Sequence, residues 1–104
     1  MDKVIEPKDG CIASALAIIG DKWSGLIIRE LTAGPQRFTA LQRALPGISP
    51  RTLSQRLDAL EAQRIIIRKT FTLAPRKVEY ALTPKGQDLI PILCSMADWG
   101  ARYA

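Results

Sequence analysis

The sequence predicts a mainly α-helical fold with one small β-hairpin. Apolar residues recur at helical spacing in several segments, and strand-like alternation is confined to residues 65–82. Proline or glycine separates most of these segments. A chain of 104 residues is expected to form a single domain with a core of its own.

Two helices are expected near the N-terminus. Residues 1–9 are polar and predict a flexible arm, whereas residues 11–20 are apolar on almost every side. That pattern is typical of a helix covered on more than one face. Gly20 ends the first helix, and Asp21 can cap a second helix over residues 22–32. Interrupted only by Glu30, the apolar stripe of the second helix consists of Trp23, Leu26, Ile27 and Leu31.

The next segment predicts two helices joined by a tight turn. Thr39-x-x-Gln42 is a capping box that opens a helix through Leu45, and Pro46-Gly47 predicts a turn. Ser49-Pro50 is a cap followed by proline at the first helical position, so a second helix is expected over residues 50–63. This order is that of a helix-turn-helix, although an ordinary helical hairpin has similar spacing.

The helix over residues 50–63 has two different faces. Leu53, Leu57 and Leu60 form the apolar face. The opposite face holds Arg51, Gln55, Asp58 and Ala62, flanked by Thr52 and Ala59. Arg, Thr and Gln are suited to guanine edges, phosphates and adenine edges. Arg56 is nearer the core edge, where it would contact a phosphate or pair with an acid.

Residues 65–82 predict a β-hairpin directly after these helices. The stretch 65–73 is β-branched and aromatic, and Val78, Tyr80 and Leu82 alternate with Lys77, Glu79 and Ala81. Ala74-Pro75-Arg76-Lys77 predicts a basic tip. Such a hairpin is a wing, which can reach the DNA backbone or minor groove. An edge hairpin protected from aggregation by its basic residues is the alternative.

A last helix is expected over residues 84–103, starting after Thr83 and bent at Pro91. One apolar stripe comprises Leu89, Leu93, Met96 and Gly100, and a second comprises Ile92, Met96, Trp99 and Tyr103. The second stripe is either additional core or the surface for a second copy of the chain. We expect a dimer interface that includes Ile12, Leu16, Ile92, Met96, Trp99 and Tyr103.

Charge and composition narrow the functional classes. Residues 37–77 hold nine Lys or Arg and two acids, whereas the rest of the chain holds six Lys or Arg and eight acids. This local excess is typical either of a polyanionic partner or of a merely solvated basic face, and the order of the elements inside the segment favours the partner. Histidine is absent and the two cysteines are 83 positions apart. We therefore expect no enzyme, metal site or cofactor. No stretch has the length of a membrane helix, and no signal peptide is expected.

In combination, these motifs resemble the HxlR-type winged helix-turn-helix transcription regulators over nearly the whole chain. The matching residues are Cys11, Gly20-Asp21-Lys22-Trp23-Ser24, Arg37-Phe38, Leu41, Pro46-Gly47-Ile48-Ser49, Leu53-Ser54-Gln55-Arg56-Leu57, Leu60-Glu61, Val78-Glu79-Tyr80-Ala81-Leu82-Thr83, Gly86, Pro91 and Trp99-Gly100. The resemblance implies one domain over residues 1–104. Its expected parts are a helix-turn-helix at 39–63, a wing at 65–82 and dimerisation helices at 11–20 and 84–103.

The resemblance also implies a function. It predicts a cytoplasmic homodimer that binds an inverted-repeat operator in double-stranded DNA and represses or activates nearby genes. A winged helix that binds proteins without specific DNA binding is the alternative. The expected DNA-binding side chains are Arg37, Thr39, Ser49, Arg51, Thr52, Gln55, Arg56, Arg68, Lys69, Arg76 and Lys77.

Cys11 matches a cysteine through which some relatives sense quinones, aldehydes or oxidants. The resemblance therefore makes Cys11 a candidate sensor, with a small electrophile or oxidant as inducer. A buried structural thiol is the alternative, and Cys94 is expected to be inert.

Two positions depart from the family pattern. Arg64 stands where glycine usually ends the recognition helix, so Gln63 or Arg64 must be left-handed at a cost of about 1 kcal/mol, unless the helix ends differently. Arg76-Lys77 stands where relatives tend to have a second proline, which makes the expected wing tip more basic.

Overall fold

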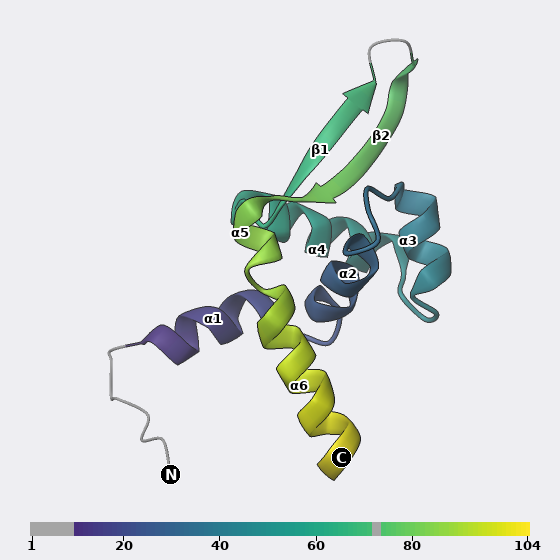
Figure 1. Ribbon diagram of the computed structural model, residues 1–104. Helices are drawn as coiled ribbons and strands as arrows, with labels where there is room; N and C mark the ends of the chain where they lie inside the picture. Colours follow the sequence, from purple (N-terminus) through teal and green to yellow (C-terminus); the bar gives the residue numbers. More distant parts are fainter. Residues whose placement is uncertain (1–9, 72–73) are drawn as a thin grey trace.

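The computed structural model describes residues 10–71 and 74–104, and it describes their side chains except at residues 71 and 74–76. The elements in chain order are α1 (Cys11–Ile19), α2 (Ser24–Leu31), α3 (Phe38–Ala44), α4 (Pro50–Ala62), β1 (Ile66–Phe71), β2 (Ala74–Leu82), α5 (Pro84–Gln87) and α6 (Ile90–Tyr103). The predicted fold class is confirmed (Figure 1). The arm expected over residues 1–9 lies outside the described residues.

The core is one cluster of aliphatic side chains at the centre of the molecule. Its members are Ile19, Ile27, Ile28, Leu31, Leu41, Leu45, Ile48, Leu53, Leu57, Leu60, Ile65, Ile66 and Tyr80. The apolar face predicted for α4 is therefore confirmed. In α2 the buried face also includes Ser24 and Ile28, which the predicted stripe omitted. Glu30, which interrupts that stripe, is partly buried and pairs with Arg29.

Of the four predicted helix caps, those at Ser49 and Thr83 are confirmed. The Ser49 side chain accepts a hydrogen bond from the backbone N–H of Thr52, and Thr83 accepts one from Gly86. Asp21 accepts hydrogen bonds from the backbone N–H groups of Trp23 and Ser24, but α2 begins at Ser24 rather than at residue 22. The prediction of a capping box at Thr39 is wrong, because α3 already begins at Phe38 and no side chain caps it. Phe38 packs against the core, so burial of this aromatic ring fixes the first turn of α3.

The hairpin is an antiparallel pair whose β2 strand is also bridged on its other side. Arg68 is opposite Tyr80 in the β1–β2 register. Tyr80 also exchanges two backbone hydrogen bonds with Gln36, at 2.8 and 2.9 Å. The segment before α3 is thus extended at Gln36, where it forms an antiparallel bridge with Tyr80.

The predicted position of the hairpin tip, residues 74–77, is wrong, because β2 already begins at Ala74. The register is irregular here: Val78 is opposite Thr70, whereas Ala74 is opposite Phe71. The intervening residues 75–77 therefore bulge from the ladder, which accommodates the missing N–H of Pro75. The side chain of Arg76 lies outside the described residues, and Lys77 is exposed on the strand.

The C-terminal segment forms two helices instead of the single bent helix that we expected. α5 ends at Gln87 and α6 begins at Ile90. Pro91 lies in the first turn of α6, where a missing N–H leaves no hydrogen bond unmade. Gly86 of α5 lies so close to Ile65 that a Cβ would collide with the Ile65 carbonyl oxygen. This close approach joins α5 to the end of α4.

The hairpin projects from one end of the molecule, and α1 and α6 project from the other (Figure 1). The radius of gyration is 15.3 Å, larger than the roughly 13 Å of a compact domain of this length. In a single chain Ile19 is the one buried residue of α1, so α1 is not covered on more than one face as expected.

Among the described residues no single helix is long and apolar enough to span a membrane. Only α1 and α2 together meet the length and composition of a span, and they are bent by 73° relative to each other.

Candidate nucleic-acid interface

The outward face of α4 begins at a rigid cap. Ser49 Oγ accepts from the Thr52 N–H at 3.0 Å and also donates to the Thr52 hydroxyl at 2.9 Å. Both hydroxyls, which were expected to touch DNA, are therefore engaged in starting the helix. Arg51 lies within this capped first turn and Gln55 in the next turn, and both are exposed. The cap fixes the backbone while these two longer side chains remain available to a partner.

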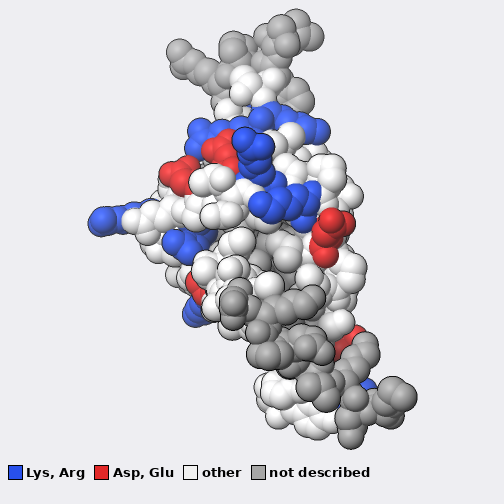
Figure 2. Space-filling view, turned by 90° about the vertical axis from the view of Figure 1, so that its left-hand side faces the viewer, with Lys and Arg blue, Asp and Glu red and all other residues white. Residues whose placement is uncertain are grey.

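Exposed cations lie on α4 and on the elements next to it, at the start and end of α3, after α4 and on both strands of the hairpin. In the part of the chain that the structure describes, six cations of the basic segment make no ion pair with another described residue: Arg37, Arg43, Arg51, Arg64, Lys69 and Lys77. Figure 2 shows Lys and Arg gathered mostly in the upper part of one face, below the hairpin, with acidic side chains between them. Such a surface attracts polyanions.

Arg56 is turned inward and pairs with an acid, one of the two roles expected for it. Its guanidinium is 3.6 Å from the Asp21 carboxylate. Partial burial disfavours the charged form of Asp21. The Ser24 hydroxyl, the backbone N–H groups of Trp23 and Ser24, and the Arg56 charge together outweigh that effect and lower the pKa of Asp21 below 3.8. Asp21 is thus an anion that holds Arg56 in place.

Arg68, also expected to bind DNA, lies on β1 and faces α4. Its guanidinium is 3.2 Å from the carboxylate of Asp58 and 3.4 Å from that of Glu61. It also lies 5.6 Å from the centroid of the Tyr80 ring. Lys69, the next residue, is on the opposite face of the strand and lines a shallow pocket with residues of α2 and the 34–35 turn.

Sequence reasoning missed the contacts that hold the end of α4. The Lys85 ammonium donates to the carbonyl oxygen of Gln63 at 2.7 Å, and the Thr83 hydroxyl donates to the carbonyl of Ile65. Carbonyls at a helix C-terminus lack intrahelical partners and favour a cation. A lysine beside the Thr83-Pro84 start signal was the available clue. Arg64 itself has a φ of 59°, which confirms the left-handed conformation expected at Gln63 or Arg64.

Both cysteines are exposed free thiols. Cys11 is the first residue of α1, at the end of the molecule opposite the hairpin. Cys94 lies on α6 and lines a mostly apolar groove of about 480 Å³ between α2 and α6. Cys94 is therefore exposed although it lies in an apolar helix, and its expected inertness stays a prediction.

A capped helix with an outward polar face, a preceding short helix and a hairpin beside them define a winged helix-turn-helix DNA-binding domain. Residues 18–104 match the family model of the HxlR-like helix-turn-helix, and the chain belongs to this family of transcriptional regulators. It is 42% identical over 87 residues to the uncharacterized HTH-type transcriptional regulator YkvN of Bacillus subtilis strain 168, covering 84% of this chain and 74% of YkvN.

Two solved structures extend the comparison. The redox regulator HypR in its reduced form superposes with a TM-score of 0.82 and 37% identity, covering 88% of this chain and 90% of HypR. Quinone-bound YodB from B. subtilis superposes with a TM-score of 0.76 and 34% identity, covering 88% of this chain and 97% of YodB. Both similarities support the winged-helix assignment.

Proposed function

We propose that this protein regulates transcription as a cytoplasmic homodimer that binds an inverted repeat in double-stranded DNA. In this proposal α4 enters the major groove, and the β1–β2 hairpin, the wing, lies along the adjacent backbone. The observation that carries it is the outward face of α4, where Arg51 and Gln55 are exposed beside a rigid cap. The exposed cations that pair with no other described residue favour DNA over a protein partner.

The surface proposed for dimerisation is the end of the molecule away from the wing. Ile12, Leu16, Ile92, Met96, Trp99 and Tyr103 are each about half exposed or more, with Trp99 at 64% and Tyr103 at 66%. Large apolar side chains exposed on two helices at one end of a molecule are typical of interfaces. A second copy related by a two-fold axis would bury the same side chains on both chains.

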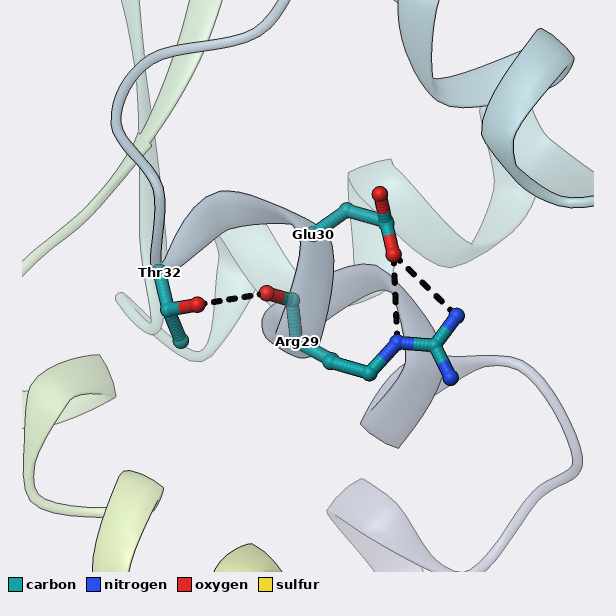
Figure 3. Close-up of polar contacts among 3 residues, drawn as sticks. All are labelled: Arg29, Glu30 and Thr32. Carbon is teal, nitrogen blue, oxygen red and sulfur yellow. Dashed lines mark hydrogen bonds and ion pairs between the residues drawn. The ribbon is translucent and has the colours of Figure 1, made fainter.

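The groove between α2 and α6 is the proposed receptor for α1 of the second copy. Its walls include Leu26, Leu93 and Met96, and α1 carries no charged residue. At the rim, the Arg29 guanidinium is turned toward Glu30 at 3.1 Å, and Thr32 donates to the Arg29 carbonyl at 2.7 Å (Figure 3). The polar side chains at the rim are thus bound to α2 and the residue after it. The apolar walls of the groove therefore remain free to contact α1 of the second copy.

Selection from a random pool of DNA duplexes tests the proposed function. We expect enrichment of an inverted repeat whose half-sites are about 10 bp, or a multiple of that, apart from centre to centre. Sedimentation of the selected complex should give two chains per duplex. If no sequence is enriched, or if one chain binds a single half-site, the protein is not the dimeric reader proposed here.

We also propose that Cys11 makes DNA binding sensitive to electrophiles or oxidants. The thiol is exposed at the start of a helix assigned to the dimer interface, so its modification would disturb the placement of the two α4 helices. HypR is named a redox regulator and YodB has been solved with a quinone, which supports the idea. Cys11→Ser should keep DNA binding and lose its release by diamide or benzoquinone.

Cys94→Ser is the control, because Cys94 is the other free cysteine of the chain. It should keep both DNA binding and the response to the reagents. If wild-type binding is indifferent to diamide and benzoquinone, Cys11 has a structural role only.

A further inference from the structure

We propose that Arg68 is a positioning residue that fixes the wing relative to the recognition helix α4, and that it is not a phosphate contact. The inference rests on the proposed DNA-binding function and assigns a different role to a cation within its basic segment. The group concerned, called the Arg68 cluster below, consists of Arg68, Asp58, Glu61 and Tyr80.

The geometry of the cluster matches the shape of a guanidinium. Asp58 and Glu61 are three residues apart on α4 and so lie on the same side of the helix. Nη2 of Arg68 donates to the Asp58 carboxylate at 3.2 Å and Nε is 3.4 Å from that of Glu61, so two nitrogens of one planar group reach two carboxylates. Tyr80, the cross-strand partner of Arg68, places its buried ring beneath the guanidinium.

The wing needs such a contact because a two-stranded hairpin has little stability by itself. Its base is held by Ile65, Ile66 and Tyr80, which are buried in the core. Residues 67–70 are exposed and continue away from that core. Of the described side chains, Arg68 alone makes polar contacts between the hairpin and α4. Its contacts therefore set the direction in which the outer part of the wing leaves the domain.

The charges around Arg68 also support a positioning role. Asp58 and Glu61 are the two acids of the basic segment 37–77, and both face Arg68. A guanidinium between two carboxylates adds no net positive charge for a phosphate to meet. The cations proposed to contact DNA are those without such partners, including Lys69 and Lys77. Arg68 thus acts on DNA through the placement of the wing.

The test compares Arg68→Lys with the double variant Asp58→Asn/Glu61→Gln, and uses Lys69→Ala as the matched control. Lysine keeps the charge and can still meet a phosphate, but it cannot span two carboxylates. In the free protein, amide hydrogen exchange of residues 68–70 and 78–80 should accelerate about two- to fivefold in both test variants, because exposed ion pairs have modest strength. Lys69→Ala should leave these rates near the wild-type values.

The second readout is the ratio of affinities for the selected duplex and a scrambled duplex. Both test variants should lower this ratio. The double variant also removes two negative charges, but this change should tighten binding to both duplexes about equally and so leaves the ratio unaffected by itself. Unchanged exchange rates in both variants would overturn the cluster's positioning role. Faster exchange with an unchanged ratio would equally overturn it, since the contacts would then stabilise the hairpin without serving recognition. If the wild-type protein binds no duplex, the proposed function fails, whereas the exchange rates still decide whether the cluster holds the wing.

Discussion

The carboxylate of Asp21 lies 3.6 Å from the guanidinium of Arg56, and this ion pair ties the start of α2 to the middle of α4. The same carboxylate accepts hydrogen bonds from the backbone N–H groups of Trp23 and Ser24, at 3.0 and 2.9 Å. One side chain therefore caps the turn that follows α1 and holds an arginine of the helix proposed to face DNA.

Asp21→Ala should destabilise the protein by roughly 0.5–2 kcal/mol at neutral pH, because two backbone N–H groups lose their acceptor. Urea unfolding at one fixed protein concentration measures the change, since dimer formation would otherwise alter the midpoint. Asp88→Ala, an exposed acid between α5 and α6 for which the structure gives no side-chain contact, is the control and should change the free energy of unfolding much less.

Asp21 should also give a particular pH dependence. Its pKa is lower in the folded protein than the ordinary value of 3.8, so its charge stabilises the fold above that pH. This stabilisation should disappear as the pH falls from about 3.8 through the lower folded-state value. The difference in unfolding free energy between the wild type and Asp21→Asn should therefore be constant near pH 6–7 and shrink in acid. A difference that grows in acid would contradict the direction of the shift.

Arg64→Gly should stabilise the protein by about 1 kcal/mol, because Arg64 has a φ of 59° that glycine adopts without steric cost. The midpoint of thermal unfolding should rise by about 4–8 °C in a chain of this size. Arg64→Ala removes the same charge without relieving the backbone and should give no such rise. An equal gain from both variants would indicate a charge effect instead.

The sequence predicted the helix-turn-helix well because its signals are local. The Ser49-Pro50 start and the spacing of Leu53, Leu57 and Leu60 fix α4 without reference to the rest of the chain. Periodicity likewise identified Ile92, Met96, Trp99 and Tyr103 as a stripe beyond the core, and these side chains are exposed.

The sequence-based predictions were wrong where contacts with residues far away in the sequence determine the structure. The capping box at Thr39 was overridden by the packing of Phe38, and the register irregularity of the hairpin moved Lys77 from a tip into a strand. The roles of Arg56 and Arg68 depend on acids that approach them from other elements. A count of charges along the sequence treats all cations alike, whereas these two arginines form ion pairs with acids of the same chain.

The dimer interface gives a prediction with a close control. Trp99→Arg and Ile92→Asp should each weaken self-association, because they place a charge in a surface proposed to be buried between two chains. Asp98→Arg, the neighbour of Trp99, is a similar charge change on the polar side of α6 and should leave association intact. Sedimentation at low micromolar concentration measures the effect. Two variants that remain dimers with wild-type stability would show that another surface pairs the chains.

The central claim is that α4 reads bases while the wing holds the backbone. Arg51→Ala and Gln55→Ala should each cost about 1–3 kcal/mol on the selected duplex and relax preference at one position per half-site. Lys77→Ala should instead weaken all duplexes about equally and reduce the salt dependence by about one unit of slope for each phosphate that the protein no longer neutralises. Arg76→Ala is predicted to behave as Lys77→Ala does.

The most direct measurement is the affinity of these variants for the selected and the scrambled duplex at several salt concentrations. The account predicts that Arg51→Ala and Gln55→Ala lower the ratio of the two affinities, and that Lys77→Ala lowers both affinities while the ratio stays the same. The opposite pattern, with specificity unchanged by the α4 variants and altered by Lys77→Ala, would contradict it and assign base reading to the wing.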